Sequence, residues 1–232
     1  MNALFSYFGD FLHLFFPELC AGCSTSLVKN ESVICTSCLY HLPYTHFHKD
    51  RENPVIRQMT GRFPLLFADS LLYYNKGSRV QNLIHELKYN NRPEVGYRLG
   101  ELYGLTLKEY GGWEVPDIII PVPLHQRKLR RRGYNQAEKI ADGLSAATKV
   151  PAKTKILMRT SDTSSQTRKS RFERYENMKN AFSVSCPGEI EGKHILLVDD
   201  VITTGATIEG CAQAALSVPG TIVSIAAIAY AE

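Results

Sequence analysis

The sequence lacks several features that would place it in a common class of protein. Its formal net charge is only +4 over 232 residues, and a charge of that size does not by itself indicate a nucleic-acid partner. It has no internal repeat or low-complexity tract, which argues against a repeat array. It has no G-x-x-x-x-G-K followed by Ser or Thr, which argues against a P-loop nucleotide site. What remains is an ordinary globular composition, 44% hydrophobic and 22% charged, with enough chain for one large domain or a core domain with a small appendage.

The positive charge is concentrated in two short segments of an otherwise nearly balanced chain. The first segment contains Arg127, Lys128, Arg130, Arg131 and Arg132, and the second contains Arg168, Lys169, Arg171 and Arg174. These residues predict two local basic patches.

The N-terminal stretch is strongly apolar, yet it does not resemble a signal peptide or a membrane span. It has no Lys or Arg near its start, it contains Asp10 and His13, and it stops at Pro17. Its apolar residues recur at helical spacing, so we expect a short amphipathic helix packed on the protein's own core. Attachment to a membrane surface is the alternative, disfavoured because the polar face lacks Lys and Arg. We therefore expect no membrane span and a cytoplasmic location.

Strand-like and helix-like segments alternate from Phe67 onward. The strand-like segments are 67–74, 117–124, 154–159, 181–185, 193–200 and 220–230, and the helix-like segments are 78–90, 93–110, 134–148 and 203–217. This alternation predicts an α/β fold, a mostly parallel sheet flanked by helices. We expect two domains, an N-terminal unit over residues 1–60 and the α/β domain over residues 61–232. The polar stretch 41–54 is typical of a linker, and 159–180 of a long loop.

Four of the six cysteines form two pairs, Cys20-x2-Cys23 and Cys35-x2-Cys38, with eleven residues between the pairs. Each pair can bring two sulfurs to one metal from a tight turn. The surrounding segment is too short and polar to form its own core, so a metal would supply the missing folding energy. We expect a structural zinc ribbon, because four thiolates leave no open coordination position. An iron–sulfur centre is the alternative.

Other metal-binding residue types in the chain are given simpler roles. His41, His46 and His48 lie near the four cysteines but are expected to be exposed loop residues. Cys186 and Cys211 are each isolated, and we expect both to be small buried residues.

The segment from Ile195 to Gly210, ILLVDDVITTGATIEG, has the strongest functional pattern. A buried parallel strand delivers Asp199 and Asp200 to the edge of the sheet, where ligands of open α/β folds bind. The Thr, Gly and Ala residues that follow open a helix, where unpaired backbone N–H groups, hydroxyls and a close-approach glycine form a phosphate cradle. The two halves suit a ligand with a diol beside a phosphate, such as a ribose 5-phosphate.

Two other interpretations of this segment are less consistent with its residues. A strand, a turn and a Thr-capped helix with solvated carboxylates would need no ligand, but adjacent Asp residues at a strand end are costly unless paired. A phospho-acceptor receiver domain also places acids at strand ends, yet it would not need the Thr-Gly cradle.

The motif ILLVDDVITTGAT resembles the phosphoribosyl-pyrophosphate motif of type I phosphoribosyltransferases. The segments PVPLHQRKLRRRGYNQA and TSSQTRKSRFERYENMKNAF, together with the four cysteines, narrow the resemblance to the ComF family. Its members are competence-associated proteins with a zinc ribbon ahead of a phosphoribosyltransferase domain. The resemblance covers nearly the whole chain.

The resemblance implies roles for particular residues in binding phosphoribosyl pyrophosphate. Asp199 and Asp200, also the catalytic candidates by location, would hold the ribose 2′- and 3′-hydroxyls. The 5′-phosphate would be held by Thr203, Thr204, Gly205, Ala206 and Thr207. The turn containing Pro123 and His125 would be the pyrophosphate loop, with Arg127 and Arg132 as supporting cations. A hood loop over 159–182 would include Gln166, Arg174 and Asn177. Lys88 matches a family lysine to which no role is attached.

The resemblance implies transfer of the phosphoribosyl group, with magnesium on the diphosphate and an acceptor left open. The rival hypothesis is a non-catalytic module that binds single-stranded DNA during uptake, alongside a competence helicase. Basic segments and aromatic residues such as Tyr134 and Tyr175 would then supply phosphate contacts and stacking. The basic segment at Arg127 to Arg132 fits pyrophosphate, DNA or a solvated face about equally well.

Overall fold

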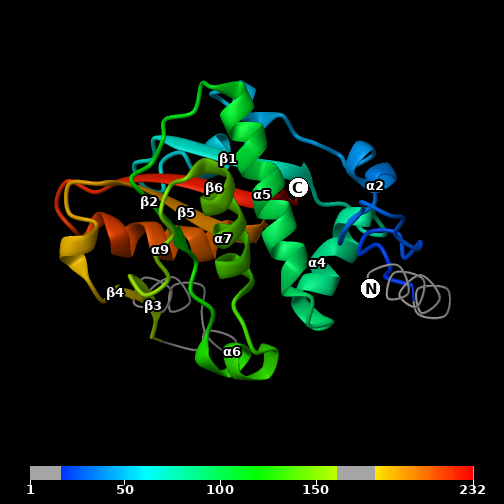
Figure 1. The fold of residues 1–232 in the computed structure, drawn as a ribbon. Coiled ribbons are helices and arrows are strands. Elements are labelled where there is room, and N and C mark those ends of the chain that lie inside the picture. The colour runs from blue at the N-terminus through cyan, green and yellow to red at the C-terminus, as the bar shows by residue number, and fades with distance from the viewer. Residues whose placement is uncertain (1–16, 161–180, 232) are drawn as a thin grey trace, which may run out of the picture.

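The computed structural model describes residues 17–160 and 181–231. Its centre is a four-stranded sheet in which all strands are parallel, in the order β1-β6-β5-β2 (Figure 1). The strands are β1 (Phe67–Tyr73), β2 (Ile118–Pro121), β5 (His194–Ile202) and β6 (Ile222–Tyr230). A separate antiparallel pair is formed by β3 (Leu157–Arg159) and β4 (Phe182–Val184). The predicted α/β fold with a mostly parallel sheet is confirmed.

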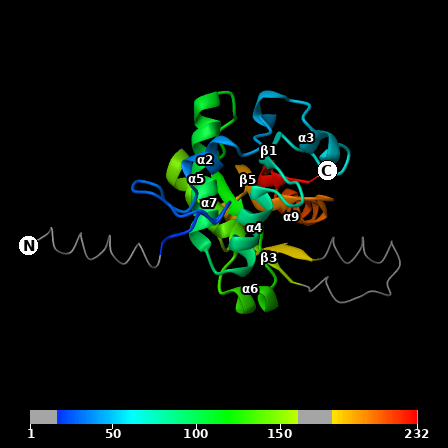
Figure 2. The same ribbon diagram turned by 90° about the vertical axis from the view of Figure 1, so that its right-hand side faces the viewer.

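The helices follow the chain order α2 (Thr36–Tyr40), α3 (Pro54–Met59), α4 (Arg79–Tyr89), α5 (Pro93–Tyr110), α6 (Gln126–Arg132), α7 (Gln136–Thr148) and α9 (Ala206–Leu216), with short 3-10 turns η1 (Phe47–Lys49) and η2 (Pro187–Glu189). Figure 2 shows α5 and α7 on one side of the sheet and α9 on the other. The sheet is therefore covered on both faces, which explains why its strands are almost continuously apolar.

Alternate residues of β5 enter two different apolar cores. Leu196 and Val198 pack with α4, α5 and α7, while Ile195 and Leu197 pack with α3 and α9. This alternation follows from the two-residue period of a strand. It also fixes the directions of the next two side chains, which are those of the acidic pair.

Helices α5 and α7 approach each other closely because small residues line their contact. A Cβ built on Gly100 would lie 2.1 Å from the carbonyl oxygen of Ile140, and one built on Gly143 would lie 2.0 Å from that of Tyr97. Side chains cannot fit at these two positions. The two helices form one rigid layer over the sheet.

Residues 41–54, expected to be a linker, instead pack against the edge strand β1. Thr45 N donates to Leu71 O at 3.1 Å, and the buried side chain of Asn53 donates to Ala68 O at 2.8 Å. His48 is 7% exposed, and its Nδ1 lies 3.9 Å from Oδ2 of the fully buried Asp69. The expectation of an exposed histidine was wrong for His48, because the edge of β1 needs a cover and this segment supplies it.

Several other expectations differ from the structure in detail. Helix α6 lies where only a turn and a basic segment were expected, because His125 caps its start and Gly133 ends it in the left-handed conformation. Cys211 is buried as expected, but Cys186 is exposed, since β4 ends at Val184 and the chain turns outward before it.

Candidate functional site

Strand β5 carries both members of the acidic pair and runs past them. Asp199 pairs in register with Ala227, and the strand continues to Ile202, opposite Tyr230, two residues beyond the expected end. The β-branched Val201 and Ile202 favour this extension. Because successive side chains alternate, Asp200 points toward α4 and Asp199 toward α9. The pair therefore brackets the sheet rather than lying side by side on one face.

Asp200 forms an ion pair with Lys88, which lies in the last turn of α4. Lys88 Nζ donates to Asp200 Oδ1 at 2.8 Å, and the two side chains are 24% and 13% exposed. Arg132, at the end of α6, also acts on this carboxylate electrostatically. Burial lowers the pKa of Arg132, and the charge of Asp200 opposes that shift. Two cations thus face one carboxylate.

Arg132 has hydrogen-bonding capacity that the protein does not use. Its Nη1 atom is buried and has no hydrogen-bond partner within the described residues. Its guanidinium lies 5.7 Å from the centre of the Tyr89 ring, which supports the cation from one face. A buried donor without an acceptor is costly, so this position favours an incoming anion.

Asp199 lies on the other face of the sheet. Burial, and then the neighbouring charge of Asp200, raise its pKa from 3.8 to about 7. Its Oδ1 accepts the backbone N–H of Asp200 at 2.8 Å, and Lys88 and Arg159 partly offset the rise. Arg159, at the end of β3, is a charged neighbour that the sequence indicated only as the end of a strand and the start of the hood loop, with no role of its own. Asp199 therefore binds a proton more readily than an ordinary aspartate.

The loop after β5 presents free backbone donors. Within the described chain, no acceptor is bound by the backbone N–H groups of residues 203–207. Gln58 holds the carbonyl of Thr203 at 2.5 Å, and Arg62 holds that of Thr204 at 2.8 Å. These contacts leave the carbonyls facing α3 and the N–H groups available to a ligand. The loop and Asp199 together line a cavity of about 40 Å³.

Gly205 has a structural role beyond the close approach inferred from the sequence. It is the N-cap of α9 with φ +75°, a left-handed conformation that favours glycine. A Cβ there would lie 2.2 Å from Cε of Met59 in α3. Helix α9 begins at Ala206, three residues later than expected, because the left-handed turn at Gly205 comes before it.

The remaining predicted site residues fall into two groups. Pro123 and His125 lie in the loop between β2 and α6, which is held beside β5 by a 2.8 Å bond from Val122 N to Val198 O. Arg127 lies on α6 and is exposed. The hood positions Gln166, Arg174 and Asn177 lie outside the described residues, as does the predicted N-terminal helix.

The four paired cysteines converge on one point. The Sγ atoms of Cys20, Cys23, Cys35 and Cys38 all lie within 4.8 Å of one another. Cys23 and Cys35 are 3.8 Å apart, and tetrahedral zinc with bonds of about 2.3 Å requires sulfurs about 3.8 Å apart. Backbone N–H groups also point at the sulfurs, with Cys35 N 3.2 Å from Cys20 Sγ. The donor set and its surroundings fit a thiolate-bound metal.

The cysteine segment packs against α4, the helix that carries Lys88. Asn82 Nδ2 donates to Gly22 O at 2.9 Å, and Arg92 Nη1 donates to Leu19 O at 3.2 Å. The buried cysteines belong to the same apolar core as Leu83 and Leu87. The metal-binding segment and the acidic site therefore share one supporting helix.

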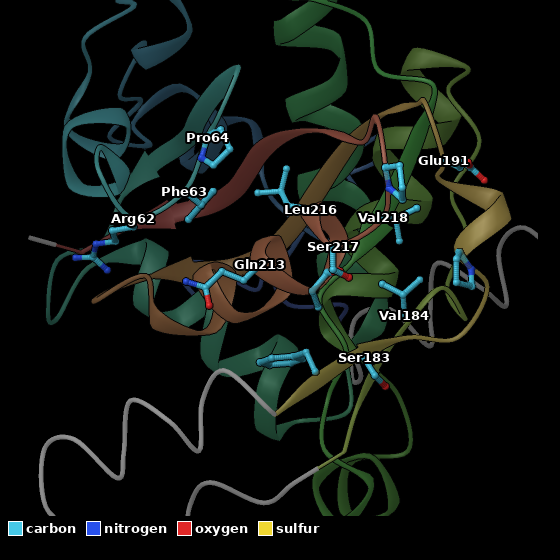
Figure 3. Close-up of a pocket in the computed structure, with 14 residues that line it drawn as sticks. Arg62, Phe63, Pro64, Ser183, Val184, Glu191, Gln213, Leu216, Ser217 and Val218 are labelled. Carbon is cyan, nitrogen blue, oxygen red and sulfur yellow. The ribbon is translucent and has the colours of Figure 1, made fainter.

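A larger cavity of about 880 Å³ lies away from the acidic pair (Figure 3). It is bordered by Phe63 and Pro64, by β4, by Leu216 at the end of α9 and by Val218 in the turn that follows. Its walls contain neither aspartate of the pair and are largely apolar side chains and prolines. Size alone does not make it the chemical site.

Fold and site together define a phosphoribosyltransferase-type α/β domain that carries a four-cysteine cluster. A model of the phosphoribosyl transferase domain matches residues 112–232. The chain is 33% identical over 198 residues to DNA utilization protein YhgH of Shigella flexneri, covering 84% of this chain and 82% of that protein. It is 37% identical over 130 residues to Competence protein F of Haemophilus influenzae, covering 54% of this chain and 57% of that protein. The chain belongs to the ComF family of phosphoribosyltransferase-domain proteins.

A more distant relative and a solved structure are also similar to this chain. Competence protein ComFC of Bacillus subtilis is 25% identical over 202 residues, covering 86% of this chain and 78% of that protein. Among solved structures, a glutamine phosphoribosylpyrophosphate amidotransferase from B. subtilis matches with a TM-score of 0.43 and 22% identity, over 62% of this chain and only 30% of that one. The structural match is too weak to bear on function. Among the helices described here, none has both the length and the hydropathy needed to cross a bilayer.

Proposed function

We propose that this protein binds phosphoribosyl pyrophosphate with Mg²⁺ where β5 meets α4 and α9. One observation carries the proposal: two carboxylates on opposite faces of β5 lead into a loop whose backbone N–H groups are free. Acceptors for a diol and donors for a phosphate lie within a few residues of each other. A ligand that carries a diol and a phosphate, and that lies across the end of the sheet, would bind these acceptors and these donors together.

Each part of the ligand has residues that suit it. Asp199 and Asp200 would accept hydrogen bonds from the ribose hydroxyls. The N–H groups of Thr203 to Thr207, at the start of α9, would hold the 5′-phosphate. Arg132, with its buried unpartnered Nη1, would hold the diphosphate, supported by His125 and Arg127 from the adjoining loop and helix. Bound magnesium would neutralise part of the charge on the diphosphate.

The reaction class that follows is transfer of the phosphoribosyl group to an acceptor. The bond from C1 of ribose to the diphosphate breaks, so negative charge grows on the leaving oxygen. Arg132 is placed to stabilise that charge, and the carboxylates hold the sugar against rotation. Asp199, whose pKa is raised by burial, would be the group best suited to exchange a proton at this site.

We assign zinc to the four cysteines as a structural ion. The sulfurs are spaced for tetrahedral coordination, and four thiolates together would fill all four coordination positions. We also propose that the boundary between this N-terminal unit and the α/β domain lies at about residue 60. The proposed location of the protein is the cytoplasm.

A second function, binding of single-stranded DNA, is favoured by the surface of α6. Arg127, Lys128, Arg130 and Arg131 are all exposed on this short helix, and Tyr134 follows it. Relatives named for DNA utilization and competence support a role in DNA uptake. In this proposal, the basic helix would contact phosphates while the acidic pair would not take part.

One pair of substitutions separates the two functions. Asp199→Asn combined with Asp200→Asn removes the negative charge from two hydrogen-bond acceptors. Charge-assisted bonds are worth about 1.5–3 kcal/mol each, so the free energy of binding phosphoribosyl pyrophosphate should weaken by a few kcal/mol. Single-stranded DNA affinity should hold or rise slightly, because negative charge is lost beside basic residues. Calorimetry with magnesium and fluorescence anisotropy with an oligonucleotide would measure these two affinities.

The matched control is Asp50→Asn combined with Asp142→Asn, which changes net charge equally on the surface. It should leave sugar-phosphate binding unchanged. If the acidic-pair variant loses DNA binding but keeps phosphoribosyl pyrophosphate, the assignment of this site is wrong.

A further inference from the structure

The sequence indicates no role for Lys88, yet in the structure Lys88 makes a direct charged contact with Asp200 of the acidic pair. Its Nζ donates to Asp200 Oδ1 at 2.8 Å. An ammonium group has three N–H donors, and this bond uses one of them. The side chain is 24% exposed, so Lys88 is partly open to solvent. Two donors therefore remain available to a ligand.

Two cationic side chains lie around Asp200. Lys88 pairs with its carboxylate and also acts on the neighbouring Asp199, and Asp200 is the carboxylate that acts on Arg132. Arg132 Nη1 is buried without a partner within the described chain. Two cations with unused donors at one place favour a multiply charged anion.

The position of Lys88 is fixed by contacts to the residues on either side of it. Tyr134 OH donates a short hydrogen bond to the carbonyl of Leu87. The ring of Tyr89 carries the guanidinium of Arg132 at 5.7 Å. These two contacts join the last turn of α4 to the chain on both sides of Gly133. They hold the ammonium and the guanidinium in one fixed arrangement around Asp200.

We propose that Lys88 binds the diphosphate of the sugar ligand, with its ammonium bridging Asp200 and the leaving group. The bridge links the carboxylate that holds the ribose to the group that departs. This inference rests on the proposed function, since it assigns Lys88 to the same ligand. It differs from a role in which Lys88 only keeps Asp200 in place.

The test compares three probes that share different parts of the ligand. Phosphoribosyl pyrophosphate has both the sugar and the diphosphate, ribose 5-phosphate lacks the diphosphate, and inorganic pyrophosphate lacks the sugar. Binding of each, with the same excess of Mg²⁺, is measured by calorimetry on the full-length protein. The variants are Lys88→Met, Lys88→Arg, and Lys139→Met as the control. Lys139 pairs with Asp142 at 3.1 Å on α7, away from the site, so its loss changes net charge equally.

Lys88→Met should weaken phosphoribosyl pyrophosphate and inorganic pyrophosphate by roughly ten- to a hundredfold, and ribose 5-phosphate by less than about threefold. Lys88→Arg should retain most of the affinity, and Lys139→Met all of it. Equal weakening of phosphoribosyl pyrophosphate and ribose 5-phosphate would overturn the inference, because Lys88 would then act only through Asp200. Unchanged binding in Lys88→Met would overturn it as well. If the unmodified protein binds none of the three probes, the proposed function itself fails.

Discussion

Asp69 on β1 gives a pH dependence of stability that can be worked out from its surroundings. The residue is 0% exposed, and its Oδ2 accepts the hydroxyl of Tyr103 at 2.8 Å while Oδ1 has no partner within the described residues. Burial raises its pKa from 3.8 to about 7, and the hydrogen bond from Tyr103 only partly offsets this. His48 is 3.9 Å away, but burial lowers its pKa, so it offers little positive charge. Asp69→Asn removes the titration while keeping the shape.

The sign of the effect follows from where the proton is bound. Between about pH 4 and pH 7 the folded protein keeps the proton on Asp69, whereas the unfolded chain has released it. The stabilisation is complete below the unfolded pKa and is lost as pH rises through the folded one. Each pH unit in this window changes the free energy of unfolding by about 1.4 kcal/mol. Between pH 5 and pH 7 the native protein should therefore lose about 2 kcal/mol more than the Asp69→Asn variant, because the slope falls off as the folded pKa is approached.

Urea denaturation followed by far-ultraviolet circular dichroism at pH 5, 6, 7 and 8 would measure this difference. The comparison is between slopes against pH, so any constant loss from the amide does not affect it. Asp199 also has a raised pKa, but it is present in both proteins and its contribution cancels. Parallel stability curves for the two proteins would show that Asp69 is ionised throughout and would refute the reasoning.

Three further substitutions test other parts of the structure. Gly100→Ala places a Cβ 2.1 Å from the Ile140 carbonyl, so it should lower the free energy of unfolding by about 3 kcal/mol or more, while Gly188→Ala, where a Cβ meets nothing within 4 Å, should have little effect in the same denaturation assay. Gly205→Ala should lower the free energy of unfolding by about 1–2 kcal/mol, through its positive φ and through the contact of the new Cβ with Met59. Adding Met59→Ala to this variant relieves only the contact, so the loss due to the positive φ should remain. Cys35→Ser should release bound zinc, measured by a colorimetric chelator, and expose the cysteine segment to protease while β5 and β6 keep their hydrogen-exchange protection; a metal-free protein whose N-terminal segment stays protected would contradict the zinc assignment.

The sequence predicted those elements whose signals are local. The apolar runs that became β5 and β6, and the periodic helices α4, α5 and α7, were identified from residue pattern alone. The cysteine cluster was predicted from spacing, because two short turns leave few ways to arrange four sulfurs. These features depend on neighbours in the chain rather than on the tertiary fold.

The sequence did not predict features that depend on distant segments. The pairing of Lys88 with Asp200 joins residues 112 positions apart, so no local pattern signals it. His48 is buried only because β1 is an edge strand, which the order of strands determines. The direction of each aspartate depended on how far β5 continues past them, and end positions of strands are the least certain part of a pattern. The closeness of Met59, which leaves no room for a side chain at position 205, likewise depends on the tertiary position of α3 and could not be predicted from the sequence.

Helix α4 has a consequence for how this protein changes in evolution. Asn82 holds the Gly22 carbonyl beside the cysteines, and Lys88 meets Asp200 six residues later, a distance of about 9 Å along the helix. A substitution that shifts α4 to suit one end would displace the other. Residues facing the cysteines and residues facing the acidic pair should therefore vary together among relatives, rather than as two independent sets. A lineage that loses the cysteines should also show altered residues at positions 82 and 88.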